Sequence, residues 1–110
     1  MTKEDRYIQG MESYADDRVE EAITSYKQAL VEDPDYADAL HALGMAYANL
    51  DQLDEAIEVG KHLIEVVPDD ELAYTSLSIF YQRKGMIDEA EAVGAKAKTL
   101  GWKRQLTGDK

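Results

Sequence analysis

Apolar residues recur three and four positions apart along nearly the whole chain, which is the spacing of one face of an α-helix. No stretch alternates apolar and polar residues in the way that a half-buried β-strand would. Polar breaks separate the periodic stretches, beginning with Asp16-Asp17-Arg18 after the first. The pattern predicts an all-α protein with six helices, at about residues 3–15, 19–32, 36–49, 53–66, the stretch between Pro68 and Gly85, and 87–99.

Proline and glycine mark the ends of these helices. Pro34 and Pro68 should each end one helix and begin the next, because proline disfavours helical geometry in the residue before it but suits the first turn of a helix. Gly85 is suited to cap the fifth helix, and Gly101 is predicted to end the sixth. Residues 102–110 are then expected to form a short basic tail that is frayed beyond the tryptophan.

One motif recurs at a fixed interval of 34 residues, as Val19-Glu20-Glu21-Ala22-Ile23, Leu53-Asp54-Glu55-Ala56-Ile57 and Ile87-Asp88-Glu89-Ala90. A single pair of short amphipathic helices cannot bury its apolar faces, so successive pairs must stack on one another. We therefore expect one domain over residues 1–110, with repeats at about 3–36, 37–70 and 71–104 and a tail at 105–110.

At these positions the chain resembles the tetratricopeptide repeat family, whose pattern the second unit matches with Leu43, Gly44, Tyr47, Ala56 and Pro68. The resemblance covers about residues 3–102. It implies an all-α, right-handed α-solenoid of three antiparallel helix pairs that acts as a non-catalytic protein-binding module.

The chain departs from the family pattern at two glycines in the second helices. Gly60 and Gly94 stand where the family has a bulky aromatic residue. We expect a large side chain to fill the space beside them, and the candidates are Tyr74, Phe80 and Trp102.

In the resembled family, the first helix of each pair lines a concave groove that holds a peptide or a partner helix. Carried onto this chain, that groove has the acidic residues Glu4 and Asp38 at its rim and an apolar or polarisable centre. Such a groove would suit a segment with apolar anchors and basic flanks; alternatively, these side chains simply fill the inner curve of a short stack. The expected groove residues are Tyr7, Met11, Tyr14, Asp38, His41, Met45, Asn49, Leu72, Thr75, Ile79, Gln82 and Arg83.

Family members that grip the C-terminal carboxylate of chaperone tails use Lys, Asn and Arg along this groove. The matching places here lack such cations, so a chaperone tail is not the expected partner; these places hold Tyr7, Met11, Ala42, Leu72 and Ser76.

A second hypothesis is self-assembly through the last helix pair, since no capping helix is visible after it. The face expected to be exposed comprises Val93, Ala97, Leu100 and Trp102. The alternative is that Trp102 folds back and caps its own pair.

Charge and composition narrow the remaining classes of function. Lys and Arg number 12 against 23 Asp and Glu, a formal charge of −11, which would repel nucleic acid and anionic lipid and attract a basic partner. There is no cysteine, no signal-peptide pattern and no apolar run long enough to span a membrane, so we expect a soluble, cytoplasmic protein.

No residue pattern indicates an enzyme, a cofactor or a metal site. His41 and His62 are far apart in the sequence, and no phosphate-binding glycine loop occurs. The paired carboxylates such as Glu20-Glu21 recur at the start of each second helix, where negative charge complements the helix dipole.

Overall fold

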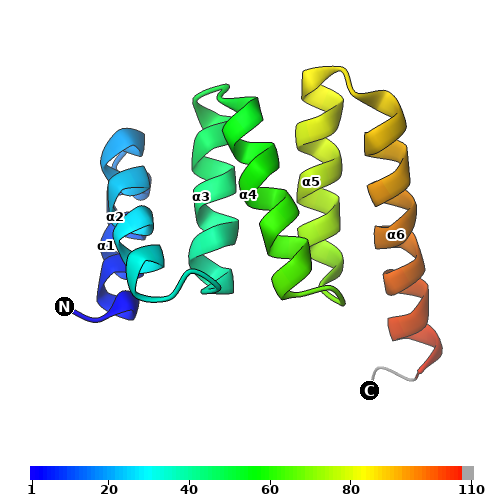
Figure 1. Cartoon of the computed structure of the whole chain (residues 1–110), viewed down its shortest axis with the longest axis horizontal. Coiled ribbons are helices and arrows are strands. Elements are labelled where there is room, and N and C mark those ends of the chain that lie inside the picture. The colour runs from blue at the N-terminus through cyan, green and yellow to red at the C-terminus, as the bar shows by residue number, and fades with distance from the viewer. Residues whose placement is uncertain (108–110) are drawn as a thin grey trace.

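The computed structural model describes residues 1–107, and every regular element in this range is an α-helix. The six helices form three antiparallel hairpins that lie side by side in chain order (Figure 1). Each helix packs on the next one along the chain, and α1 and α5 also contact α3. The expected all-α solenoid is confirmed, with helices α1 (Lys3–Ala15), α2 (Val19–Glu32), α3 (Ala37–Asn49), α4 (Leu53–Val66), α5 (Glu71–Lys84) and α6 (Ile87–Leu106).

The tight turn inside each hairpin contains one residue with left-handed backbone geometry, always at the same place in the repeat. These residues are Asp17, Asp51 and Gly85, with φ values of 65°, 61° and 86°. Aspartate tolerates this conformation better than most residues, and glycine adopts it without steric cost. The 34-residue spacing of the sequence is therefore set by the backbone of these turns as well as by the apolar faces.

Side-chain caps fix several helix starts. Thr2 and Asp5 form a capping box at the start of α1, in which each side chain accepts a hydrogen bond from the other residue's backbone N–H. Asp70 caps α5 by accepting from the N–H of Leu72 at 3.0 Å.

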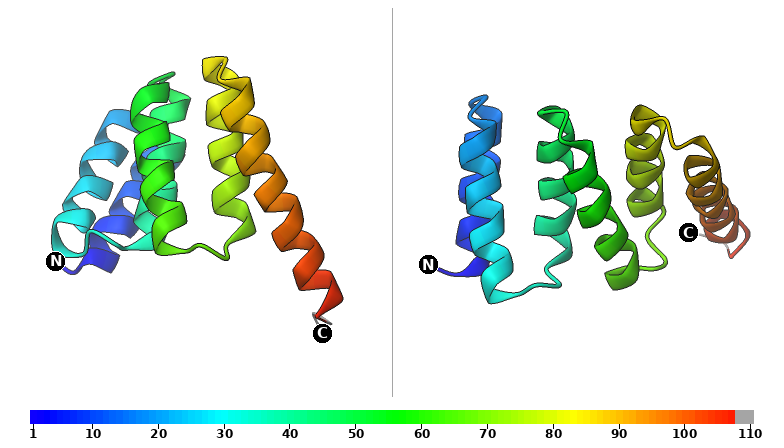
Figure 2. Two further views of the ribbon diagram at one scale, coloured as in Figure 1. Left: turned by 45° about the vertical axis from the view of Figure 1, so that its right-hand side comes forward. Right: turned by 45° about the horizontal axis from the view of Figure 1, so that its top comes forward.

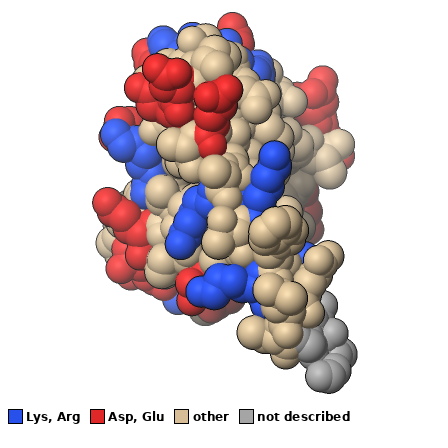
Figure 3. Space-filling model, turned by 90° about the vertical axis from the view of Figure 1, so that its right-hand side faces the viewer, with Lys and Arg blue, Asp and Glu red and all other residues tan. Residues whose placement is uncertain are grey.

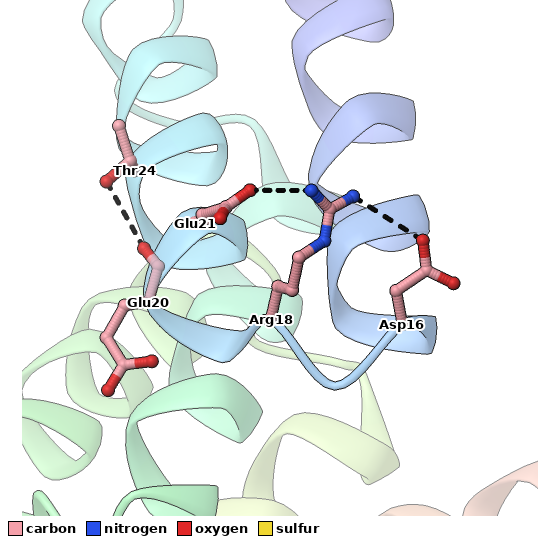
Figure 4. A network of polar contacts seen from close by, with 5 residues as sticks. All are labelled: Asp16, Arg18, Glu20, Glu21 and Thr24. Carbon is pink, nitrogen blue, oxygen red and sulfur yellow. Dashed lines mark hydrogen bonds and ion pairs between the residues drawn. The ribbon is translucent and has the colours of Figure 1, made fainter.

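The start of α2 is held by a charged side chain instead of a cap. Arg18 lies between two carboxylates, 3.0 Å from Glu21 and 3.4 Å from Asp16 (Figure 4). Thr24, one turn further on, donates a hydrogen bond to the Glu20 carbonyl of its own helix. The pairs are exposed, so they orient the turn more than they stabilise it.

The core runs along the whole stack, with small residues where the helices approach most closely. Ala22, Ala56 and Ala90 recur at the same place in the three second helices, and each is almost completely buried. Gly10 likewise leaves room for the ring of Tyr26, because a Cβ at this position would lie 2.5 Å from that ring. Small residues thus let the helices approach closely enough to pack against large aromatic and aliphatic side chains.

The two glycines of the second helices have different surroundings. A Cβ on Gly60 would meet Leu77 at 3.0 Å and Phe80 at 3.7 Å, so the expectation that Phe80 fills this space is confirmed, with Leu77 beside it. A Cβ on Gly94 would meet only Ser78, so the expectation of a large residue there is wrong. No helix follows α6 within the described residues, and none is present to supply such a residue.

The last helix is longer than the sequence predicts. It does not end near Gly101 but continues to Leu106, and Figure 2 shows it running past the end of α5. Gly101 lies against the carboxylate of Glu71, and the same carboxylate pairs with Arg104 at 3.0 Å. These contacts with α5 support the extra turns, so the fraying expected beyond Trp102 is wrong for residues 103–106. The tail was also expected to include residues 108–110, which lie outside the described range.

Candidate functional site

The residues expected to line a groove all belong to α1, α3 and α5, the first helices of the three hairpins. Contacts of α3 with both α1 and α5 make these helices one continuous surface, here called the inner face. Several of its large apolar side chains are exposed to solvent: Met11 by 47%, Met45 by 43% and Ile79 by 47%. Each repeat supplies at least one such residue, and the third also exposes Leu72.

A cavity of about 260 Å3 lies on the inner face between α3 and α5, and the end of α1 reaches it. It brings together five of the twelve expected residues, Tyr14, Met45, Asn49, Ile79 and Arg83. Ala48, Ser76 and Phe80 also line it. The expected groove residues include none of the three, although the resemblance placed Ser76 at a clamp position along the groove. Ser76 and Phe80 are one helical turn apart on α5, so helical spacing could have placed them beside the expected residues.

Two polar contacts tie neighbouring repeats together at this surface. The Asn49 amide donates to the Tyr14 hydroxyl at 3.4 Å, and His41 Nε2 lies 3.2 Å from Ser76 Oγ. Each contact joins residues 35 positions apart. They help to hold α1, α3 and α5 side by side.

Tyr7 is a packing residue more than an exposed anchor. Its ring lies 6.0 Å from that of Tyr26 and 5.7 Å from that of Tyr36, measured between centroids. Burial, together with the charge of Asp38, raises the pKa of the Tyr7 hydroxyl, so the side chain stays neutral well into alkaline pH.

Most of the remaining expected residues lie outside this cavity. Thr75 and Gln82 line a different cavity of about 330 Å3 between α5 and α6, which Ile79 also touches. Arg83 is held by Asp51 at 3.1 Å, so the one expected cation is already paired. The structure places Met11, Asp38, His41 and Leu72 on the inner face but outside both cavities.

The residues expected to form an exposed self-assembly face do not form one. Ala97 and Leu100 are buried against Tyr74 of α5, and Val93 is half-buried beside them. Trp102 is 73% exposed, which also makes the alternative wrong, because this side chain does not fold back onto its own pair. The reason is that the extended α6 carries Trp102 beyond the end of the hairpin.

The histidines take part in separate polar contacts. His62 Nε2 is 3.0 Å from Asp35 Oδ1 and 3.2 Å from the Pro34 carbonyl, at the loop between α2 and α3. Within residues 1–107 no group of three or more histidine or acidic side chains could hold a metal ion. No helix in that range is long and apolar enough to span a bilayer.

Comparison of the sequence with protein-family models finds two matches. A model described as "TPR repeat" matches residues 10–51, and one described as "Tetratricopeptide repeat" matches residues 37–70. The two matches together run over the first two hairpins. No curated protein matches the sequence.

Comparison with solved structures finds the same architecture. "Crystal structure of MamA" has a TM-score of 0.91 and 32% identity over 94% of this chain and 61% of that chain. "Crystal structure of MamA protein" has a TM-score of 0.90 and 31% identity over 97% and 58%. This chain therefore spans less than two thirds of either MamA chain.

A more distant structure has nearly the same length as this chain. "Second TPR of Spaghetti (RPAP3) bound to HSP90 peptide SRMEEVD" has a TM-score of 0.85 and 18% identity, over 91% of this chain and 93% of that one. At this identity the likeness is one of fold.

Proposed function

We propose that this chain, which belongs to the tetratricopeptide repeat family, is a non-catalytic adaptor that binds a peptide or a helix of a partner protein on its inner face. The observation that carries the proposal is that each first helix exposes nearly half of a large apolar side chain, namely Met11, Met45 and Ile79, and that the last two line an open cavity. Methionine side chains are flexible and polarisable, so they suit a surface that adapts to a bound segment.

The charges of the chain indicate the chemistry of the partner. The formal charge of −11 and the exposed carboxylate of Asp38 favour a segment with basic residues beside its apolar anchors. The related fold in Spaghetti was solved with a peptide bound, so peptide binding is compatible with this architecture. The proposed segment differs from that peptide, because the places of the family's cationic clamp hold Tyr7, Met11, Ala42, Leu72 and Ser76 here.

The test is to capture partners from the source cell's lysate and then measure the affinity of the captured protein for variants. Met45→Glu places a charge at the edge of the cavity and should weaken binding at least about tenfold, the effect of losing a central interface contact. Thr24→Glu makes the same charge change on the exposed side of α2 and should bind as the wild type does.

Unchanged affinity in Met45→Glu, with a thermal melt equal to that of the wild type, would refute binding at the inner face. Equal loss in both variants would show that the added charge, and not its position, is responsible.

A second candidate is self-assembly around Trp102, because this tryptophan and Leu106 are 73% and 84% exposed on the same helix. Sedimentation velocity over a range of protein concentrations tests it. A dimer that Trp102→Ala dissociates would support self-assembly, whereas a single monomeric species at the highest concentration would remove it.

A further inference from the structure

Helix α6 is the second helix of the third hairpin. Its residues differ from those of α4 on the face that corresponds to the packing of α4 against the next hairpin. In α4 this face consists of Ile57, Gly60 and Ile64, and Leu77 of α5 lies against the glycine. The residues 34 positions later are Glu91, Gly94 and Lys98, of which the two charged ones are exposed. Charge at these positions gives this face the polar character that terminal repeats carry.

The neighbouring face of α6 changes in the opposite sense. On α4 it is charged and exposed, with Glu58, Lys61 and Glu65. On α6 the same places hold Ala92, Ala95 and Thr99, and all three are exposed.

This uncharged face continues along the extra turns of the helix. Trp102 and Leu106 follow Ala92, Ala95 and Thr99 at alternating spacings of three and four, so the five residues form one row along α6. We call this row, Ala92, Ala95, Thr99, Trp102 and Leu106, the outer strip. All five residues are exposed, and Ala95, Thr99 and Trp102 also border cavities that α6 shares with α5. The row has small residues at one end and two large apolar ones at the other.

Basic residues flank the outer strip, although the chain as a whole is strongly acidic. Residues 92–107 contain four Lys or Arg and no Asp or Glu. Lys96, Lys98 and Lys103 have no acidic partner among residues 1–107, whereas Lys3, Lys61 and Lys84 each have one. Figure 3 views this side and shows blue basic side chains beside tan surface, with the red acidic ones gathered mainly toward the top and left of the view.

We propose that the outer strip is a docking surface for an amphipathic helix of an acidic partner protein, separate from the inner face. The apolar residues of the partner helix would lie along Ala92, Ala95 and Thr99 and cover Trp102 and Leu106. Its flanking carboxylates would pair with Lys96, Lys98 and Lys103.

Charge complementarity decides between this occupant and the others. A second copy of α6 would bring the same lysines opposite these, which is destabilising for helices packed side by side. A lipid surface needs no small residues, whereas small residues such as Ala92 and Ala95 let a second helix approach closely. The acidic body of the molecule would also repel anionic lipid.

The only tryptophan of the chain, Trp102, reports directly on the strip. The probe is a synthetic amphipathic helix of about 21 residues, long enough to be helical, with Leu at the a and d positions and Glu at the e and g positions, and without Trp or Tyr. The matched peptide has Lys in place of Glu. We expect the acidic peptide to shift Trp102 emission to shorter wavelength, with an affinity that weakens as salt is added, and the basic peptide to cause no shift.

Variants locate the binding, with affinity read from the anisotropy of a labelled acidic peptide. Ala95→Glu introduces a repelling charge on the strip and should weaken binding at least about tenfold. The double variant Lys96→Gln/Lys103→Gln leaves the strip intact and should reduce the dependence of affinity on salt. Thr24→Glu, on the equivalent face of α2, is the control and should bind as the wild type does.

The absence of an emission shift at peptide concentrations up to about 1 mM would overturn the proposal. So would an equal shift with both peptides, or wild-type affinity in Ala95→Glu. A dimer that Trp102→Ala dissociates would assign the strip to a second copy. An emission shift with vesicles of phosphatidylserine and phosphatidylcholine, but not with the acidic peptide, would assign it to lipid. Either assignment also overturns the proposal.

Discussion

The ring of Tyr26 in α2 lies directly over Gly10 in α1, so that a Cβ on the glycine would be 2.5 Å from Cε1 of the ring. Tyr26 is 2% exposed and its ring also packs on that of Tyr7, so it has little room to move. Gly10→Ala should therefore destabilise the protein by about 1–3 kcal/mol, the cost of overpacking, although alanine favours the helix by about 1 kcal/mol. Urea unfolding measures this difference. A stabilised variant would mean that α1 can shift away from the ring.

The two glycines of the second helices give a matched comparison. A Cβ on Gly94 has only Ser78 nearby, with Oγ at 3.3 Å, so Gly94→Ala should stabilise the protein by up to about 1 kcal/mol through helix propensity. In Gly60→Ala the new methyl group would meet Leu77 at 3.0 Å, and the same gain should be reduced or lost. Thermal melts of the two variants test the difference. Equal stabilisation would show that the Leu77 side chain moves away from the new methyl group at little energetic cost.

The left-handed backbone geometry of the hairpin turns predicts which substitutions of Gly85 destabilise the protein least. No atom lies within 4 Å of a Cβ built there, so a substitution acts through the backbone conformation alone. Gly85→Asp introduces the residue that the other two turns already have, and it should cost less than Gly85→Val, for which we expect at least about 1–2 kcal/mol. Denaturant midpoints of the two variants measure the order. If valine were tolerated as well as aspartate, the turn would have another conformation available.

The ion pair between Lys3 and Asp33 predicts how stability changes at the extremes of pH. The Lys3 ammonium donates to Asp33 at 2.6 Å, and this hydrogen bond lowers the pKa of the Asp33 carboxyl, helped by the Asp35 backbone N–H. A lowered folded-state pKa gives stability that is present above the unfolded value of about 3.9 and is lost as pH falls through the folded one. The same hydrogen bond raises the pKa of Lys3, so its contribution is present below about 10.4 and is lost above the folded value.

Asp33→Asn should therefore lower the melting temperature near neutral pH, and the difference from the wild type should shrink below about pH 3. Melts recorded from pH 2 to 8 check the prediction. Parallel curves would show that the pair has no linked effect on stability.

The fold could be predicted from the sequence because its signals are local and repeated. The helices expected at 36–49 and 53–66 lie within one residue of the observed α3 and α4. Their ends are set by the prolines and by the turn residues such as Asp51, which act within a few positions of the chain.

The end of α6 could not be predicted, because long-range contacts decide it. Glycine is a common residue at helix C-termini, but Gly101 is inside α6, beside the Glu71 carboxylate that also holds Arg104. The candidate site shows the same limit. Alignment with the repeat pattern placed the expected groove residues on α1, α3 and α5, where the structure has them. The packing of Tyr7 on Tyr26 and Tyr36 depends instead on how α1 meets α2 and the loop after it.

The order of helix contacts has a consequence for how the molecule opens. The inner helices are held on more than one side, whereas α6 packs on α5 alone among the described helices. Separating α6 from the stack therefore removes a single interface, and the free energy of this local opening should be well below that of global unfolding. Amide hydrogen exchange should then be graded along the chain, slowest in α3 and α4 and fastest in α6. We therefore expect α6 to be the helix of the described fold that separates most readily from its neighbour and packs on it again.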